Sequence, residues 1–264
     1  MVIDFHTHTF PDSIAAKTIK VLEGNADIKA FTDGTLQGLK ESMDGFIDLS
    51  VILPVVTKPS QFATINRFAA LLNEKERDVI SFGGMHPDTS DYKSELREIK
   101  LLGLKGIKLH PAYQKTRIDD PAYMKIVDYA SELGLIISVH AGIDIGLPDP
   151  VYCTPRQAAA LIKEVKPEKL VLAHMGGWKL WDEVEECLVG ENVWFDTSFT
   201  HGYMGEHQML SILRNHGADK ILFGSDSPWS GQAESLEAFC RLPLTEEERE
   251  SILWRNAAKL LKLE

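Results

Sequence analysis

The 264-residue chain has few cysteines, an excess of acidic over basic residues and no long hydrophobic run. Its cysteines, Cys153, Cys187 and Cys240, are scattered without metal-site spacing, which predicts reduced thiols. The net charge of −11 at pH 7 argues against a nucleic-acid partner, because phosphates would be repelled. No apolar stretch approaches the roughly 20 residues of a membrane span, and strand-like sequence from Val2 leaves no room for a signal peptide. We therefore expect a cytoplasmic protein without a membrane partner.

Nucleotide-binding motifs are also missing, since no GxGxxG follows the first apolar run and no Walker A sequence occurs. The chain instead alternates short apolar runs with amphipathic stretches. The apolar runs predict strands over residues 2–8, 45–56, 79–86, 104–110, 135–140, 169–174, 192–197 and 220–226. Helices are predicted between most of these runs, and two more over residues 232–240 and 245–261.

This alternation predicts the fold. The near-continuous apolar run GFIDLSVILPVV (45–56) is typical of a strand buried on both faces, as in parallel sheets. Strand followed by helix, about eight times over, indicates right-handed parallel crossovers. Eight such units in this length match a closed barrel, whose usual size is about 250 residues. We predict an α/β fold, a (β/α)8 TIM barrel forming a single domain over residues 1–264, with an additional C-terminal helix.

Histidines gather at the ends of the predicted strands. Six of the nine lie at or just beyond a carboxyl end: His6, His8, His86, His110, His140 and His174. The eighth strand adds Asp226 at the same position. In a TIM barrel these ends converge on one mouth, where active sites lie. Three histidine nitrogens and one carboxylate make a suitable ligand set for Zn²⁺, and would equally suit Mn²⁺, Fe²⁺ or Ni²⁺.

The motifs IDFHTH, SVHAG, LAHMGG and GSDSPW, in this order, resemble the amidohydrolase superfamily. More narrowly they resemble its amidohydrolase-related branch, which contains hydrolases, lactonases and aminocarboxymuconate-semialdehyde-type decarboxylases. The closing segment ILWRNAAKLLKL is similar to that branch as well, so the resemblance spans the whole chain. It implies that His6, His8, His140 and Asp226 bind metal. It also implies that His174 is a further ligand or polarises the substrate or the metal-bound water.

Asp226 and His174 are the candidate catalytic residues. A bound metal lowers the pKa of its water to roughly 7, and a carboxylate beside that water can accept and return its proton. Candidate substrate-binding residues are those placed near the mouth on strand ends, loops or helix starts: His86, Lys108, His110, Tyr113, Arg156 and Trp178.

Lys108 leaves the metal count open. In some branches of the superfamily a fourth-strand lysine is carboxylated and bridges two metals, and Lys108 lies on the fourth predicted strand. Alternatively, a buried lysine pairs with Asp226 or binds an anionic substrate. We expect one divalent metal per chain.

The leading functional prediction is a metal-dependent hydrolase that cleaves a C–N or C–O bond of a small molecule. The first alternative is a metal-dependent non-oxidative decarboxylase of an aromatic or enoic acid, which would use the same ligands. A TatD-like deoxyribonuclease is the second, because GMHP, GSDSP and the opening HxH are similar to that family. Against it, Lys108 and His110 stand where its fourth strand supplies a glutamate. A non-catalytic barrel kept as a scaffold would be expected to have an incomplete ligand set, whereas the set here is complete. The sequence is compatible with a homo-oligomer.

Overall fold

The computed structural model describes residues 1–263, and its core is a ring of parallel strands. Every strand pairs in parallel with its neighbours, in the order β1-β2-β3 and β4-β5-β6-β7-β8-β9. The strands are β1 (Ile3–Thr7), β2 (Leu49–Ile52), β3 (Val79–Ser81), β4 (Gly83–Gly84), β5 (Gly106–Leu109), β6 (Ile136–Val139), β7 (Leu170–Leu172), β8 (Trp194–Asp196) and β9 (Ile221–Leu222).

Two junctions join these strands into a closed barrel. At the first, β3 and β4 belong to one stretch of chain that is interrupted at Phe82. At the second, the N–H of Phe5 on β1 donates to the carbonyl of Phe223 just after β9, at 2.8 Å. The predicted (β/α)8 TIM barrel is therefore confirmed, with the third predicted strand divided in two.

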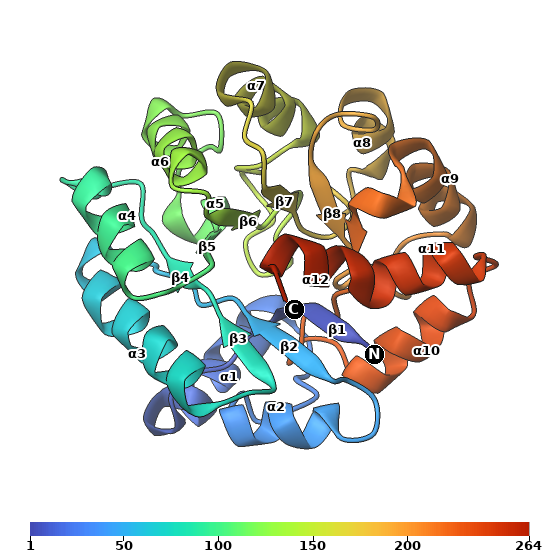
Figure 1. The fold of residues 1–264 in the computed structure, drawn as a ribbon, viewed down its shortest axis with the longest axis horizontal. Coiled ribbons are helices and arrows are strands. Elements are labelled where there is room, and N and C mark those ends of the chain that lie inside the picture. The colour runs from blue at the N-terminus through green and yellow to red at the C-terminus, as the bar shows by residue number, and fades with distance from the viewer. Residues whose placement is uncertain (264) are drawn as a thin grey trace.

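Helices surround the barrel (Figure 1). They are α1 (Asp12–Ala26), α2 (Leu36–Met43), α3 (Phe62–Lys75), α4 (Tyr92–Leu101), α5 (Pro111–Gln114), α6 (Pro121–Glu132), α7 (Pro155–Val165), α8 (Trp181–Cys187), α9 (Glu206–His216), α10 (Gln232–Cys240), α11 (Glu246–Glu250) and α12 (Asn256–Leu261). The short α5 was not predicted, and a π-helical turn (Ser251–Arg255) divides the helix predicted over 245–261 into α11 and α12. Over residues 1–263, no helix has the length and apolarity needed to cross a membrane.

Local sequence explains where several helices begin. Before α7, the hydroxyl of Thr154 accepts the N–H of Gln157 at 3.2 Å, and the Gln157 side chain accepts the N–H of Thr154 at 2.9 Å. Thr245 and Glu248 form the same reciprocal pair before α11, as the sequence predicted. A capping residue of this kind stabilises a helix by about 1 kcal/mol.

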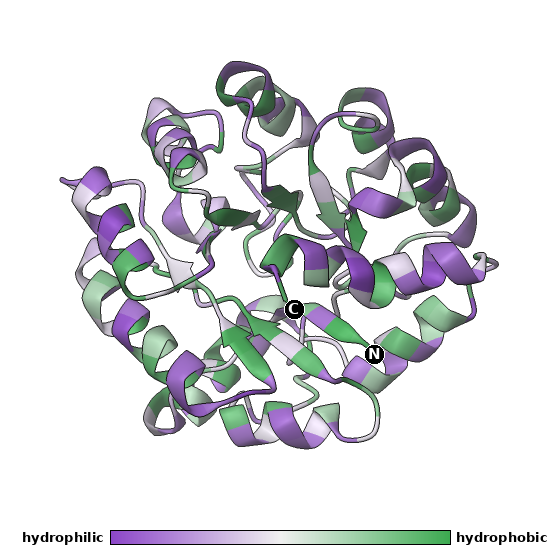
Figure 2. Cartoon of the chain, viewed as in Figure 1, coloured by the Kyte–Doolittle hydropathy of each residue, from purple (hydrophilic) through white to green (hydrophobic). Residues whose placement is uncertain are grey.

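The additional C-terminal helix closes one end of the barrel. Apolar side chains of α12, among them Ala257 and Leu260, join a buried cluster with Phe5, Val51 and other strand residues. The ammonium of Lys105, immediately before β5, donates to the carbonyl of Leu261 at 2.6 Å, so α12 lies at the amino ends of the strands. Figure 1 shows α12 across the centre of the view, and Figure 2 shows largely apolar strands inside a ring of helices that mix apolar and polar residues. The carboxyl ends of the strands are left for the functional site.

The connection between β1 and β2 contains two helices, where a barrel repeat needs one. The second, α2, buries Leu39 and Met43. The first, α1, is nearly twice as long yet buries only Ala15 and Ile19. Because α1 begins five residues after β1 ends, it lies beside the carboxyl ends of the strands.

Candidate active site

A cavity of about 950 Å³ opens at the carboxyl ends of the strands. Strand-end and adjacent loop residues that line it include His6, His8, Lys108, His110, Tyr113, His140, His174, Trp178 and Asp226. The structure therefore brings to one cavity all four predicted metal ligands, both predicted catalytic residues and four of the six predicted substrate-binding residues.

The other two predicted substrate-binding residues lie outside this cavity. Arg156 is exposed and forms ion pairs with Glu183 at 2.6 Å and Glu186 at 2.8 Å, both on α8. His86 is buried, and its Nδ1 accepts the N–H of Asp88 at 3.1 Å. The structure therefore does not bring Arg156 or His86 into the cavity with the other four.

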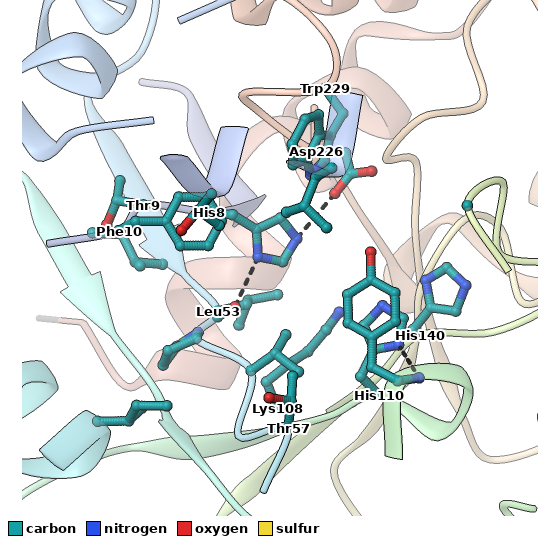
Figure 3. A pocket seen from close by; sticks show the side chains of 18 of the residues that line it. His8, Thr9, Phe10, Leu53, Thr57, Lys108, His110, His140, Asp226 and Trp229 are labelled. Atoms are coloured by element: carbon teal, nitrogen blue, oxygen red, sulfur yellow. Dashed lines mark hydrogen bonds and ion pairs between the residues drawn. The ribbon is translucent and has the colours of Figure 1, made fainter. Parts of the chain in front are cut away.

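His6, His8 and Asp226 form the first group of potential metal ligands. The Nε2 atoms of His6 and His8 lie 3.2 Å apart. Oδ1 of Asp226 lies 3.1 Å from Nε2 of His8 and 3.4 Å from Nε2 of His6. Figure 3 shows the His8 ring between Leu53 and Asp226. Donor atoms from β1 and from the segment after β9 thus converge on one point.

The remaining nitrogens of both rings have partners that fix their orientation. Nδ1 of His8 donates to the carbonyl of Leu53 at 2.8 Å (Figure 3), so its Nε2 carries the lone pair. Nδ1 of His6 donates to the carboxylate of Asp196 at 2.9 Å, and the ammonium of Lys108 lies 3.1 Å from His6 Nε2 as a donor to its lone pair. Such partners orient metal-binding histidines. Both rings therefore carry their lone pair on Nε2, and at His6 a bound cation would replace the hydrogen bond from Lys108.

Asp196 is a residue beside the ligand groups that the sequence reasoning did not single out. It is fully buried at the end of β8, and its carboxylate accepts the N–H groups of His174 and Ser198, each at 3.1 Å. Burial alone would raise the pKa of this carboxyl, but His6 outweighs it and holds the pKa well below its usual range. The strand-end position that identified the histidines would also have identified Asp196, which ends the predicted strand NVWFDT.

His110, His140 and Asp144 form a second group of potential ligands. Oδ2 of Asp144 lies 3.6 Å from Nε2 of His110 and 3.8 Å from Nε2 of His140, beyond hydrogen-bond distance. The His110 and His140 rings stack at 4.3 Å between centroids. Within the described residues, the buried Nε2 of His140 has no hydrogen-bond partner. The predicted ligand His140 thus lies in a different group from the other three.

His174 lies between the two groups. Its ring centroid is 5.3 Å from that of His6, and its Nε2 is 3.1 Å from Nδ1 of His140. Nδ1 of His174 donates to the carbonyl of Ser198 at 2.9 Å, which directs Nε2 toward His140. The backbone at His174 is left-handed, with φ of 59°, as it is at Asp226, with φ of 74°. Strained backbone of this kind costs about 1–3 kcal/mol per residue and clusters at active sites.

Tyr113 and Trp178 contribute aromatic surface to the cavity. The Tyr113 ring stacks on His110 at 3.9 Å between centroids. The indole N–H of Trp178 donates to the carbonyl of Phe199 at 3.1 Å. Both rings are therefore held in place by neighbours of the site.

Burial sets the protonation states of the cavity. It lowers the pKa of Lys108 to about 8, and together with Lys108 it lowers the pKa of His6 to about 4. Burial also lowers the pKa of His140. Burial alone would raise the pKa of Asp226, but His6 and His8 outweigh it and hold the pKa below its usual range. At neutral pH the rings of His6 and His140 are therefore neutral and Asp226 is ionised, the states that bind a cation.

These residues fit a divalent cation. The first group combines two imidazole nitrogens with one carboxylate oxygen, donors that suit Zn²⁺, Mn²⁺ and related ions. The buried Nε2 of His140, which has no hydrogen-bond partner within the part of the chain that the structure describes, offers a further nitrogen in the same cavity.

Comparison with known proteins identifies the family. The family model described as Amidohydrolase matches residues 3–263. The chain belongs to this family. The resemblance carried by the four motifs is confirmed, and the protein is an enzyme of the amidohydrolase superfamily.

One curated relative is Decarboxylase orsB of Emericella nidulans (strain FGSC A4). It is 34% identical over 92 residues, which cover 33% of this chain and 27% of that protein. The chain therefore spans about a quarter of the length of this relative.

Solved structures share the fold over the full chain. An uncharacterized TIM-barrel protein from Bordetella bronchiseptica has a TM-score of 0.79 at 18% identity, covering 99% of this chain and 98% of that one. 5-Carboxyvanillate decarboxylase LigW from Sphingomonas paucimobilis has a TM-score of 0.73 at 15% identity, covering 100% and 99%. A dihydroxybenzoic acid decarboxylase from Polaromonas sp. JS666, with bound manganese and the inhibitor 2-nitroresorcinol, has a TM-score of 0.71 at 16% identity, covering 99% and 97%.

Proposed function

We propose that the protein is a metal-dependent non-oxidative decarboxylase of an aromatic or enoic acid. The decarboxylases named among its relatives support this reaction over the hydrolysis that the sequence favoured. The observation that carries the proposal is the position of Lys108 at the barrel end of a cavity with apolar walls.

Lys108 is suited to hold the carboxylate of an acid. Its side chain is buried, and among residues 1–263 it is the one lysine or arginine that lines the cavity. Apolar residues, among them Phe10, Leu53, Trp178 and Trp229, form much of the cavity wall. An ionised carboxylate is costly to bury unless it is paired, so an acid would place this group beside Lys108 and its unsaturated body against the wall.

We propose that His6, His8 and Asp226 hold a divalent cation, with His140 and His174 adjacent. Zn²⁺ suits this donor set, and Mn²⁺, the ion in the Polaromonas structure, suits it equally. When bound, such a cation would supply positive charge that stabilises negative charge on substrate oxygens. Asp196 and the Leu53 carbonyl would keep the two imidazole rings in their binding orientation.

Decarboxylation also needs a proton. The bond between the carboxyl carbon and the substrate carbon breaks, CO₂ leaves, and the electron pair that stays on the substrate carbon takes up a proton. We assign this transfer to His110 and Asp144, which line the cavity 3.6 Å apart and lie outside the first ligand group. His174, with Nε2 between the two groups, would contact the substrate.

Hydrolysis is the second candidate, and one observation favours it. The carboxylate of Asp226 lies 3.1 Å from the ligand nitrogen of His8, where it could accept a proton from an attacking water. The two candidate reactions therefore draw on different proton-transfer groups: Asp226 for hydrolysis, and His110 with Asp144 for decarboxylation. A mostly apolar cavity with a single lysine favours a small molecule over the deoxyribonucleic acid of the TatD-like alternative.

The test is to incubate the Mn²⁺- or Zn²⁺-loaded protein with hydroxylated aromatic acids labelled with ¹³C in the carboxyl group. We expect labelled CO₂, and in D₂O a product with one deuterium on the vacated carbon. The matched control is His207→Ala, which removes an exposed histidine outside the cavity and should leave the rate unchanged. Hydrolysis of a lactone or amide panel without CO₂ release from any acid would overturn the proposal.

A further inference from the structure

We propose that the substrate combines a single acidic head with an extended apolar arm, and that the arm lies between α1 and α3. This inference rests on the proposed function, since it places the head beside Lys108. It concerns the part of the cavity that lies away from the metal-ligand groups.

The first wall of this region is one face of α1. Ile14, Thr18 and Leu22 recur every four residues, so they share a face of the helix, and all three line the cavity. The helix buries only Ala15 and Ile19, and Ile14 is 48% exposed. The helix α1 thus turns this face toward the cavity and buries few of its other side chains. These are the properties expected of a wall that binds a ligand.

The second wall is one face of α3. Ile65, Phe68 and Leu72 follow the spacing i, i+3, i+7 and line the same cavity. The buried residues of α3 also include Phe62 and Asn66, on a different side of the helix. Leu72 also joins the buried core cluster, whereas Ile65 and Phe68 lie outside it, and Phe68 is 37% exposed.

The third wall is the loop after β6. Ile143, Ile145 and Leu147 line the cavity from this loop, and Leu147 is 40% exposed. Exposed apolar side chains grouped around one opening mark binding sites. The cavity volume leaves room for an arm in addition to an acidic ring. At about 950 Å³ it is near the top of the range for ligand pockets, about 300–1,000 Å³, and it exceeds what a single substituted ring would fill.

Charge limits what the arm can carry. Lys108 is the one lysine or arginine among the described residues that line the cavity, and it lies beside His6. The polar residues contributed by the α1 and α3 region, such as Ser13, Asn25 and Gln61, are uncharged. A second carboxylate on the arm would be desolvated without a cationic partner. The geometry therefore points to a monocarboxylic acid with an apolar arm.

The experiment measures binding by calorimetry and CO₂ release in parallel, on the metal-loaded protein. The probes are 2-hydroxybenzoate, its 6-methyl, 6-propyl and 6-pentyl derivatives, and the pentyl derivative with a terminal carboxylate. We expect each added methylene to tighten binding about fourfold until the arm fills the region. The terminal carboxylate should remove this gain.

Three variants locate the arm. Phe68→Ser and Ile14→Ser remove apolar surface, and each should shrink the affinity ratio between the pentyl and unsubstituted acids about fivefold. Thr18→Trp fills the space and should shrink the same ratio further. The matched control is Leu101→Ser, which alters a leucine that is 87% exposed on α4 and outside the cavity, and should leave the ratio at its wild-type value.

The outcomes separate this inference from the proposed reaction. If affinity rises with chain length and falls in the three variants, the arm site is supported even where no acid releases CO₂; that result would overturn only the decarboxylase. If CO₂ is released but affinity is independent of chain length, or the variants match Leu101→Ser, the arm site is overturned while the reaction stands.

Discussion

The two groups of potential ligands at the mouth differ in how firmly the fold positions them. In the first group, the donor atoms of His6, His8 and Asp226 lie within 3.4 Å of one another, and partners hold both rings. In the second, the carboxylate of Asp144 stands 3.6 Å and 3.8 Å from its histidines, and Nε2 of His140 has no hydrogen-bond partner among residues 1–263. This difference agrees with the proposed roles, a cation at the first group and contact with the substrate at the second.

The largest expected effect comes from removing the first group. His6→Ala and Asp226→Asn should each abolish metal binding and lower the rate of CO₂ release by about 10⁴-fold or more, because a catalytic cation contributes several kcal/mol. Metal content by mass spectrometry and the initial rate are the measurements. Full metal content in His6→Ala would refute the assignment of the first group.

Removing the second group should separate catalysis from metal binding. Asp144→Asn and His110→Ala should lower the rate about 10²-fold, the usual contribution of a general acid, while metal content stays at the wild-type level. His207→Ala serves as the control. Loss of the metal in both variants would show that the second group also holds metal, and would contradict the proposed difference between the two groups.

Metal stoichiometry tests the same contrast in the unaltered protein. We expect one tightly held ion per chain, bound by the first group. Two ions per chain, both retained after dialysis, would indicate that the second group also binds metal and would revive a carboxylated, bridging Lys108.

A smaller effect is expected from the partner of His6. Asp196→Asn keeps the shape of the side chain but weakens the hydrogen bond that orients the ring. Metal affinity should fall about 10- to 100-fold, and saturating metal should restore most of the rate. A rate that metal cannot restore would show that Asp196 acts in the reaction itself.

The smallest effect is on acid stability of the metal-free protein. The pKa of His6 is about 4 when folded, against about 6.5 when unfolded, so the unfolded chain binds more protons between these values. Stability present above about pH 6.5 should therefore be lost as the pH falls toward 4. Burial shifts His110 in the same direction. In urea titrations at pH 7, 6 and 5, His6→Gln and His110→Gln should each lose less stability on acidification than the wild type.

Sequence reasoning was sufficient where position along a strand determines position in space. The carboxyl ends of parallel strands meet at one mouth, so strand-end histidines such as His6 and His174 could be brought together from sequence. The separation of His140 from the first group could not, because it depends on Asp144 in an irregular loop. Arg156 turns away because glutamates on α8 pair with it, a contact that no local pattern encodes. The wall formed by α1 could not be predicted either, because it depends on how this additional helix lies against the barrel.

The contact between β1 and the segment after β9 has a consequence for how the protein matures in the cell. His8 and Asp226 stand 218 positions apart in the chain, so the ribosome makes one long before the other. The backbone N–H of Asp226 donates to the carbonyl of His6 at 2.8 Å, so the group assembles in the step that closes the barrel. A cation that binds only this closed form stabilises it by mass action. We therefore expect metal uptake to follow closure of the ring of strands, so that a bound cation would report that the ring is complete.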